Sequence, residues 1–448
     1  MKVNQRYDYK DSGTKSLGQI PKHWETVPLK YSLAIPITDG PHSTPDLEDT
    51  GVPFLSAEAV KNDRLDFENR RGYISPEDHA EFSKKYKPQL GDVYMVKSGA
   101  TTGNVARVET SQEFNIWSPL AALRPDLRYV TTDFLFYFMK SKSFFHSVEL
   151  SWSYGTQQNI GMGVIANLKM PRPPVEEQIS IGDYLNSKMA KIDALIDKKK
   201  ELIERLEQQR IAIITQAITK GLDSNAHLTD SGVEWLGQVP EHWSIPALKM
   251  RYKAELGKML DEKRITGNYL VPYLRNTDVQ WDSINYEDLP QMDISEEEHD
   301  RYTISESDVL VCEGGEVGRT AVVTTPQEVV GFQKALHRLR PEKDTEVPRF
   351  LFYTLFWAAN TGVFDVEGSS TISHLTGEQL RRYRFPQPPR LEQMAITDYL
   401  DGETEKIDRL IKRVEIAINQ LTEYRTALIT AATTGKIDVR NFTLGEVK

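Results

Sequence analysis

The sequence is poor in the features that mark secreted and membrane proteins. It contains one cysteine, Cys312, so the chain cannot form an intramolecular disulfide. Its first residues, Met1 to Asp8, lack the apolar stretch of a secretory signal. The longest apolar run, Phe350 to Ala359, has about half of the roughly 20 residues that a membrane crossing requires. We therefore expect a cytoplasmic protein without a membrane partner, in which this run forms a buried helix.

An excess of positive charge, which nucleic-acid-binding domains usually carry, is also missing. The chain has 55 Lys and Arg against 65 Asp and Glu, a net charge of −10. This balance argues mildly against DNA as a ligand. Net charge does not describe how the charges are distributed, however. A surface lined with Lys and Arg can lie on an acidic protein or be completed by a partner.

Catalytic signatures are absent as well. The sequence has no Gly-x-Ser-x-Gly, His-Glu-x-x-His, Cys-x-x-Cys or Asn/Asp-Pro-Pro-Tyr/Phe motif, and its nine His show no metal-ligand spacing. Glu313 to Thr320 fails as a phosphate-binding loop, because Gly314 and Gly318 enclose three residues and Arg319 stands where a Lys is required. We read it as a tight turn between strands. The expectation is a chain with no catalytic residue, no metal site and no bound cofactor.

What the sequence does contain is a second copy of itself. Asp11–Trp24 returns as Asp230–Trp243, with Leu-Gly-Gln-Ile/Val-Pro-x-His-Trp in both. Pro171–Asp223 returns as Pro386–Asp438, with Pro-x-Pro-Pro-x-x-Glu-Gln, Asp-Tyr-Leu and Lys-Ile-Asp-x-Leu-Ile in both. The period near 215 residues is far above the roughly 20 to 50 of solenoid repeats. Each copy is therefore domain-sized, and the molecule should have two-fold pseudosymmetry.

Two globular stretches lie between the repeated segments. Short strand-like runs separated by turn residues predict a mixed α/β fold for each, and Val52–Leu55 in the first matches Val271–Leu274 in the second. The loops between such anchors diverge, which suggests one task performed on two targets. The predicted divisions are 1–170 (first domain), 171–223 (first helical spacer), 224–385 (second domain), 386–438 (second helical spacer) and 439–448 (tail).

Each Pro-Pro segment is followed by a charged stretch whose apolar residues recur at alternating steps of three and four, as in a coiled coil. The first of these helices is expected to open at Val175 and to end near Gly221. Its seam repeats 215 residues later. The seam residues are Ile192, Ile196, Lys199, Ile203, Leu206, Arg210, Ile213 and Ala217 in the first helix, and Ile407, Ile411, Val414, Ile418, Leu421, Arg425, Leu428 and Ala432 in the second.

The two seams should pair with each other in antiparallel fashion, because two-fold pseudosymmetry then puts one domain at each end. Roughly 30 residues at 1.5 Å each span about 45 Å, enough for a spacer. The alternative is that each helix only covers its own domain. Arg210 and Arg425 inside the seams fit a device that fixes the register or contacts to a partner helix, since burial without a partner would be costly.

These motifs together resemble the specificity (S) subunit of type I restriction-modification systems, and the resemblance extends over nearly the whole chain in the family's order. Gly91-Asp-Val93 followed by Ser98-Gly-Ala-Thr-Thr-Gly-Asn-Val-Ala106 belongs to the same pattern. The resemblance implies two α/β target recognition domains separated by two long antiparallel helices that form a coiled coil. It implies a non-catalytic subunit in which each recognition domain reads one half of a split double-stranded DNA site.

The same resemblance implies several partners. Two modification (methyltransferase) subunits would bind S-adenosylmethionine, and two restriction subunits would cleave DNA with ATP and Mg. The helix pair would set the unread gap of the DNA site and dock the modification subunits. Much of the positive charge that neutralises phosphates would then come from those partners, which makes the acidic balance tolerable.

Base edges are read by Asn, Gln, Arg, Lys, Ser and Thr side chains, so loops rich in these residues are candidate DNA contacts. The family's recognition domains diverge too much for a transfer residue by residue. The candidates are His42, Ser43, Thr44, Lys97, Ser98, Asn104, Tyr154, Thr156, Gln157, Gln158 and Asn159 in the first domain, and Arg319, Lys334, His337, Ser369, Ser370, Thr371 and His374 in the second.

Two further observations concern charge. Lys84–Lys87 and Arg381–Arg384 are candidate phosphate contacts, although a solvated charged face is the commoner explanation of such runs. Glu313–Glu316 stands where the first domain has Ser98–Thr101, which places carboxylates on a loop expected to face DNA. A carboxylate can accept a hydrogen bond from the amino group of cytosine, so this difference fits a difference in specificity.

Two other classes of function stay open at this point. A scaffold could bridge two copies of a protein partner without reading DNA. A stand-alone restriction or modification enzyme is disfavoured by the missing cofactor motifs.

Overall fold

The computed structural model describes residues 7–150, 159–260, 266–324, 326, 328–364, 374–440 and 442. By its internal contacts the chain forms two compact units. Unit 1 comprises Met1–Lys199 with Glu415–Lys448, and unit 2 comprises Lys200–Val414. Each unit therefore contains one globular part together with part of each of two long helices. The predicted divisions give each helical spacer a region of its own, whereas the two units divide each long helix between them. The predicted divisions therefore stay a prediction.

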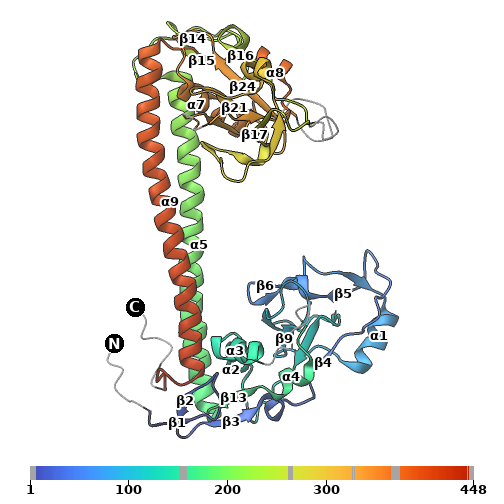
Figure 1. Cartoon of the computed structure of the whole chain (residues 1–448). Coiled ribbons are helices and arrows are strands. Elements are labelled where there is room, and N and C mark those ends of the chain that lie inside the picture. Colours follow the sequence, from blue (N-terminus) through green and yellow to red (C-terminus); the bar gives the residue numbers. More distant parts are fainter. Residues whose placement is uncertain are drawn as a thin grey trace. The chain divides into compact units, whose positions relative to one another are not determined.

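Unit 1 begins with short strands and turns. Its elements before the first long helix are β1 (Tyr9–Asp11), β2 (Gln19–Pro21), β3 (Glu25–Pro28), η1 (Leu29–Ser32), β4 (Thr38–Asp39), β5 (Val52–Leu55), η2 (Ala57–Ala59), β6 (Val60–Lys61), β7 (Arg64–Leu65), β8 (Gly72–Ile74), α1 (Pro76–Lys85), β9 (Val93–Val96), β10 (Val105–Arg107), β11 (Asn115–Ile116), β12 (Leu120–Leu123), α2 (Thr132–Met139), α3 (Lys142–Leu150), α4 (Met162–Asn167) and β13 (Lys169–Arg172). The main sheet has the order β10-β9-β12-β4 and is antiparallel. Figure 1 labels β9 and β4 of this sheet. A three-stranded sheet has the order β11-β5-β8, with β11 and β5 parallel.

Unit 2 repeats this plan. Its elements between the long helices are β14 (Leu228–Asp230), β15 (Gln238–Pro240), η3 (Leu248–Met250), β16 (Tyr252–Leu256), β17 (Leu270–Leu274), η5 (Asn276–Asp278), β18 (Val279–Gln280), β19 (Ser283–Ile284), β20 (Gln291–Asp293), η6 (Glu296–Glu298), α6 (His299–Tyr302), β21 (Val309–Cys312), β22 (Thr320–Val322), β23 (Gly331–Phe332), β24 (Leu336–Pro341), α7 (Pro348–Asn360) and α8 (Gly377–Arg382). Its main sheet, β22-β21-β24-β16, has the strand order of unit 1, and β17 pairs with β20 and β23 as β5 does with β8 and β11. The two globular parts share one mixed α/β fold, as predicted.

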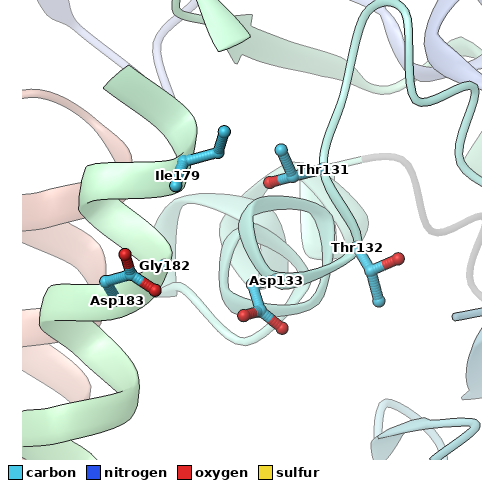
Figure 2. Close-up of a pocket in the computed structure, with 6 residues that line it drawn as sticks. All are labelled: Thr131, Thr132, Asp133, Ile179, Gly182 and Asp183. Atoms are coloured by element: carbon cyan, nitrogen blue, oxygen red, sulfur yellow. The ribbon is translucent and has the colours of Figure 1, made fainter. Parts of the chain in front are cut away.

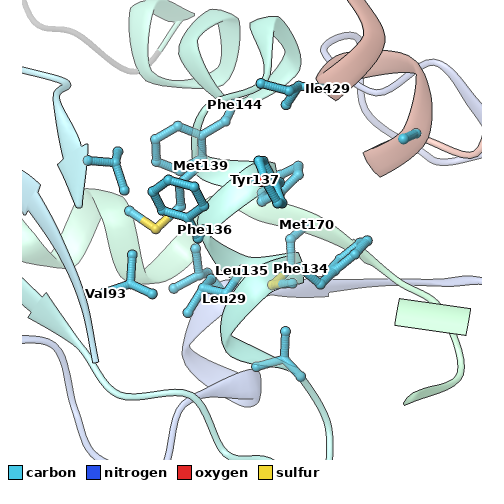
Figure 3. Packing of buried hydrophobic residues seen from close by; sticks show 14 of the residues in the cluster. Leu29, Val93, Phe134, Leu135, Phe136, Tyr137, Met139, Phe144, Met170 and Ile429 are labelled. Atoms are coloured by element: carbon cyan, nitrogen blue, oxygen red, sulfur yellow. The ribbon is translucent and has the colours of Figure 1, made fainter. Parts of the chain in front are cut away.

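The core of unit 1 forms around α2. Thr131 caps this helix by accepting from the amide of Phe134, and every residue from Phe134 to Met139 is buried. These side chains pack with Leu29, Val93 and Met170, and with Ile429 from the second long helix. Figure 3 labels all of them except Phe138. Burial of each large apolar side chain contributes roughly 1.5–3 kcal/mol, so this helix anchors the unit.

The corresponding helix of unit 2, α7, contains the longest apolar run of the sequence. Eight of its side chains, from Phe350 to Ala358, are buried in the unit's core, which confirms the predicted buried helix. No helix in the described part of the chain is both long and apolar enough to cross a membrane.

The two long helices begin and end where the sequence predicts. α5 (Val175–Lys220) and α9 (Arg390–Thr433) each start directly after a Pro-Pro pair. The chain then turns at Gly221 with φ +73° and at Gly435 with φ +68°, the left-handed region in which a residue with a Cβ is strained. Proline before the first turn and glycine after the last therefore define both helices.

The predicted seams are the paired faces of α5 and α9. All sixteen seam residues are buried or half-buried, whereas most residues between them are exposed. In unit 1 the guanidinium of Arg425 pairs with Asp193, and in unit 2 that of Arg210 pairs with Asp408. From Asp193 to Arg210 the chain advances 17 residues along α5, while their partners on α9 go back 17 residues, from Arg425 to Asp408. The pairing is therefore antiparallel. The first turns of α5 also pack on their own domain through Ile181 and Leu185.

Candidate nucleic-acid interface

Three segments that are distant in the sequence lie together at one end of the main sheet of unit 1. The amide of Lys97, directly after β9, donates to the carbonyl of Pro119 at 2.8 Å, and its carbonyl accepts from the amide of Ile160 at 2.8 Å. Ser98 forms a β-bridge with Asn159. The structure therefore brings together Lys97, Ser98 and Asn159, which the sequence analysis selected separately.

The loop that contains His42 joins them through Asp39, the last residue of β4. The carboxylate of Asp39 is 1% exposed. Its Oδ1 accepts from Nζ of Lys85 at 2.5 Å, while its Oδ2 lies 3.2 Å from Nε2 of His42 and 3.4 Å from Nζ of Lys97. We call Asp39, His42, Lys85 and Lys97 the Asp39 cluster. One buried carboxylate thus holds three basic side chains from three elements.

Gly40 explains how this loop comes so close to the sheet. A Cβ on Gly40 would lie 1.7 Å from the carbonyl oxygen of Ile116, so only glycine fits there. The next residue, Pro41, accepts from the amide of Ser118 at 3.3 Å. These backbone contacts place the exposed residues His42, Ser43 and Thr44 near the start of β12.

Unit 2 builds an equivalent surface from different residues. A Cβ on Gly257 would lie 2.2 Å from the carbonyl oxygen of Gln333, and the next residue, Lys258, accepts at its carbonyl from the amide of Lys334 at 3.0 Å. Glu313 donates its amide to Ala335 at 3.0 Å and accepts from the amide of Leu375, the neighbour of His374, at 2.8 Å. The unit 2 loop surface therefore consists of Lys258, Glu313, Lys334 and His374.

The strand registers revise one equivalence that sequence spacing had suggested. Val96 of β9 pairs with β12 as Cys312 of β21 pairs with β24, so Glu313 corresponds to Lys97 and not to Ser98. The turn between β21 and β22 in unit 2 is one residue shorter than the turn between β9 and β10 in unit 1. The spacing of the sequence motifs does not show where this residue is missing. By the same registers Leu256 corresponds to Asp39. An ion cluster in unit 1 is thus replaced in unit 2 by an apolar side chain and a carboxylate.

Other candidate residues have different positions. Asn104 reaches the carbonyl of Val60 at 3.5 Å, and its counterpart Arg319 donates to the carbonyl of Asn276 at 2.8 Å, so both tie a Gly-rich turn to a neighbouring strand or 3-10 turn. His337, a predicted DNA contact, does not belong to this surface. It is 1% exposed, its Nε2 lies 2.9 Å from the carbonyl of Leu375, and burial lowers its pKa. Its ring faces the interior of the unit.

Seven of the candidates lie outside the described residues. They are Tyr154, Thr156, Gln157, Gln158, Ser369, Ser370 and Thr371. Conversely, sequence reasoning missed Asp39 and Lys258 and treated Lys85 only as part of a basic run. Each of the two missed residues adjoins a glycine whose close approach to another strand is visible only in the folded chain. Within the described ranges, no three His, Cys, Asp or Glu side chains are arranged to hold a metal ion.

A β-hairpin in each unit is fixed to the helices by an aspartate with positive φ. Asp63 (φ +70°), in the turn between β6 and β7, forms ion pairs with Lys140 at the end of α2 and with Arg425 of α9. Burial acts to raise the pKa of Asp63, but these two cations outweigh it and lower the pKa. Burial in turn lowers the pKa of Lys140 to about 8.

Unit 2 makes the same connection with other residues. Asp282 (φ +57°), between β18 and β19, pairs with Arg349 of α7, which also lies 2.6 Å from the carboxylate of Asp401 on α9. In both units ion pairs therefore connect the hairpin to the helices.

The duplicated motifs hold the helix ends. His23 lies 2.8 Å from Glu177 at the start of α5, and Trp24 packs against Gly435 at the end of α9. His242 and Trp243 make the same contacts to Glu392 and Gly221. Each His-Trp pair therefore links the start of one helix to the end of the other, which stabilises the antiparallel pairing.

A pocket of about 230 Å³ lies between the start of α2 and α5 (Figure 2). Its lining is Thr131, Thr132, Asp133, Ile179, Gly182 and Asp183. A Cβ on Gly182 would come within 3.0 Å of the Asp133 side chain, so glycine keeps the two helices close. The exposed side chain of Ile179 borders the opening, which makes this a surface with both apolar and acidic character.

Exposed apolar side chains recur on both long helices at equivalent positions. Ile179 and Leu195 on α5 are 51% and 44% exposed, and their counterparts Met394 and Leu410 on α9 are 40% and 45% exposed. Each unit presents one such pair. We call these four residues the outer apolar positions.

Comparisons with known proteins agree on one family. The model of the type I restriction modification DNA specificity domain matches residues 21–205 and 250–420. A candidate type I restriction enzyme specificity subunit, MjaX of Methanocaldococcus jannaschii, is 24% identical over 96% of this chain and 98% of its own length. The EcoKI specificity subunit of Escherichia coli is 21% identical over 94% of this chain and 91% of its own.

Solved structures share the fold. A chain from a study of complex assembly and conformational transition of the type I R-M system superposes with a TM-score of 0.67, covering 92% of this chain and 98% of its own at 17% identity. The HsdS subunit of Thermoanaerobacter tengcongensis superposes with a TM-score of 0.53, covering 93% and 98% at 18% identity.

Proposed function

Because the chain belongs to the family of type I restriction-modification specificity subunits, we propose that it is the DNA-reading, non-catalytic subunit of such a complex. Each unit would read one half of a bipartite, asymmetric double-stranded site. One observation carries this proposal: both units gather loops at the same end of the same sheet, yet Lys97 in one corresponds to Glu313 in the other. Two surfaces of one design with different charged residues at equivalent positions suit two unlike half-sites.

The helix pair would set the unread gap between the half-sites. α5 and α9 run without interruption for 46 and 44 residues, and each begins in one unit and ends in the other. A continuous α-helix adds about 1.5 Å for every residue, so its length is a fixed quantity. The ion pairs of Arg210 and Arg425 with Asp408 and Asp193 support a single register.

The outer apolar positions are the proposed docking surface for two modification subunits. Each unit presents an equivalent pair of these side chains, and a duplicated surface suits two copies of one partner. The repetition of these side chains at equivalent positions of both units, and not their exposure alone, supports this role. Through these partners two restriction subunits would join the complex. S-adenosylmethionine would bind to the modification subunits, and ATP and Mg to the restriction subunits. A complex that acts on cellular DNA would work in the cytoplasm.

Modified-base sequencing of a host that carries the locus, with and without this chain, tests the proposal. The expected result is a methylated, split motif that disappears when the chain is deleted. A motif that persists would contradict DNA reading by this chain and would favour the alternative, a scaffold that only bridges protein partners. Incubation of the purified chain with DNA and labelled S-adenosylmethionine should give no methyl transfer, and transfer would contradict the non-catalytic role.

A further inference from the structure

The Asp39 cluster carries more positive than negative charge. Lys85, Lys97 and His42 surround a single carboxylate, so the cluster has a net charge of +1 with a neutral imidazole and +2 with a protonated one. The carboxylate itself is almost completely buried, whereas the side chain of His42 is 71% exposed and that of Lys85 is 46% exposed. The cluster therefore presents its basic side to solvent and its acidic side to the core.

Lys97 is the most informative member. Its side chain is 11% exposed, and its one ion pair within the described part of the chain is with Asp39 at 3.4 Å. An ammonium has three donors, and normal hydrogen bonds to oxygen are about 2.7–3.2 Å long. The described residues thus leave donors of the Lys97 ammonium without an acceptor at hydrogen-bond distance, and its Nζ atom keeps contact with solvent although the rest of the side chain is largely buried. The protein therefore holds a charged donor at its surface, where a ligand can supply the acceptor.

Geometry also limits what this acceptor can be. Lys97 adjoins Ser98 and Asn159, and His42 begins the exposed stretch His42–Thr44, so the cluster lies inside the loop surface proposed to face DNA. Ammonium and imidazolium groups donate hydrogen bonds to oxygen and nitrogen acceptors. On duplex DNA the phosphate oxygens are acceptors, and among the base acceptors the O6 and N7 atoms of guanine are the commonest specific partners of a lysine.

We propose that the Asp39 cluster is a binding site for a DNA acceptor, in which Lys97, with Lys85 and His42, contacts either the O6/N7 edge of guanine or a phosphate oxygen. The inference rests on the proposed function and deepens it. Asp39 acts as a positioning residue that orders the three donors. The site belongs to unit 1 alone, because Leu256 and Glu313 stand at the positions of Asp39 and Lys97 in unit 2.

Selection of the full-length chain on a pool of random-sequence duplexes, followed by affinity measurements over a range of salt concentrations, tests this site. The variants are Lys97→Gln, Lys97→Arg and His42→Gln. Lys22→Gln is the matched control, because Lys22 has a 62% exposed side chain and pairs with Asp8 at 3.5 Å, outside the cluster and outside the candidate DNA contacts. All variants are first compared by thermal unfolding. His42→Gln keeps the test valid if Lys97→Gln does not fold, because the exposed His42 side chain contributes little to packing.

A guanine contact predicts that Lys97→Gln and His42→Gln lose the preference for guanine at one position of one half-site, with roughly a tenfold to hundredfold loss of affinity for the original motif. A phosphate contact predicts an unchanged motif, weaker binding to every sequence, and a salt dependence reduced by about one ion. Lys97→Arg keeps a positive charge and donors that suit guanine or phosphate, so it should retain most of the affinity and the motif in both cases.

The inference is overturned if Lys97→Gln, or His42→Gln where the former does not fold, equals Lys22→Gln in both motif and salt dependence. Failure of the proposed function is a different outcome, since the wild-type chain would then enrich no motif at all.

Discussion

Nε of Arg425 on α9 lies 3.1 Å from Oδ1 of Asp193 on α5. Arg210 on α5 forms the equivalent ion pair with Asp408 on α9. Arg210 and Arg425 occupy the same position in the two repeats, and so do Asp193 and Asp408. The two ion pairs are therefore equivalent. The seam arginines have partners on the opposite helix, and both pairs exist only in one antiparallel register. Their surroundings differ, however, because Arg425 also pairs with Asp63.

This difference predicts unequal costs of removing the two arginines. Arg425→Met leaves the half-buried Asp63 with one cation fewer and should lower the free energy of unfolding by about 2–3 kcal/mol, since an uncompensated buried charge is costly. Arg210→Met is the matched control. Its partner Asp408 is 62% exposed, so the loss should stay below about 1 kcal/mol. Urea unfolding followed by circular dichroism measures both, and equal losses would contradict the role given to Asp63.

The buried ammonium of Lys140 predicts a rise of stability with pH. Its pKa is about 8 in the folded chain, against about 10.4 in an unfolded one. Between these values the unfolded chain holds the proton that the folded chain has lost, so unfolding takes up a proton and its free energy increases with pH. The gain in the free energy of unfolding from this group is complete above about pH 10.4 and absent below about pH 8.

Comparison of wild type with Lys140→Met, by urea unfolding at pH values from 7.5 to 10, isolates this group. The difference in free energy of unfolding between the two should change by up to about 3 kcal/mol over the window, with the wild type gaining. A difference that is constant with pH would contradict the lowered pKa.

The sequence predicted the local features of this fold well. The seam residues follow a short period, and the limits of α5 depend on Pro174 and Gly221, whose effects on the backbone are local. The convergence of Lys97 with Asn159 could not be predicted, because it depends on pairing between segments far apart in the chain. The equivalence of Glu313 was misassigned for a related reason. A turn that is shorter by one residue shifts the register, and only the strand partners reveal it.

Gln178 explains the Glu-Gln part of the duplicated motif. Its fully buried amide accepts from the amide of Thr131 at 2.9 Å and donates to the carbonyls of Tyr129 and Pro173. Gln178→Leu should cost about 2–4 kcal/mol, since it leaves these backbone groups without partners. Hydrogen exchange should show faster exchange at the Thr131 amide.

Gln393→Leu offers an independent repetition of this experiment in unit 2. Its oxygen accepts from the amide of Val347 at 3.0 Å, so the faster exchange should there appear at Val347 and leave Thr131 protected. Exchange that rises over the whole chain in either variant would argue against a local role for the glutamine.

The glycine that follows α9 should be irreplaceable for two reasons. Gly435 has φ +68°, and a Cβ there would lie 2.4 Å from the ring of Pro21. Gly435→Ala should therefore cost about 1 kcal/mol for the backbone conformation and a further 1–3 kcal/mol for the clash. Gly18→Ala is the control, because Gly18 has φ +62° with open space around it and should lose only the first part. Equal melting temperatures of the two variants would contradict the packing of the short repeat on the helix end.

The proposed link between helix length and the DNA gap leads to an insertion experiment whose design follows from the two ion pairs. A heptad inserted only in α5, between Asp193 and Arg210, would put one of the two arginine–aspartate pairs out of register. A heptad inserted in α5 and another in α9, between Asp408 and Arg425, preserves both pairs and the seam. The doubly extended chain should therefore fold, with helices longer by about 10 Å.

At roughly 3.4 Å for each base pair this extension corresponds to about three base pairs. Modified-base sequencing of a host that expresses the doubly extended chain should show a motif with the same two half-sites and a gap longer by about three base pairs. The single insertion is the control, and its broken register should abolish the motif or lower the stability of the chain. Methylation with the original gap in the doubly extended chain would show that helix length does not determine the gap, and the half-sites would then have to be positioned by the partner subunits.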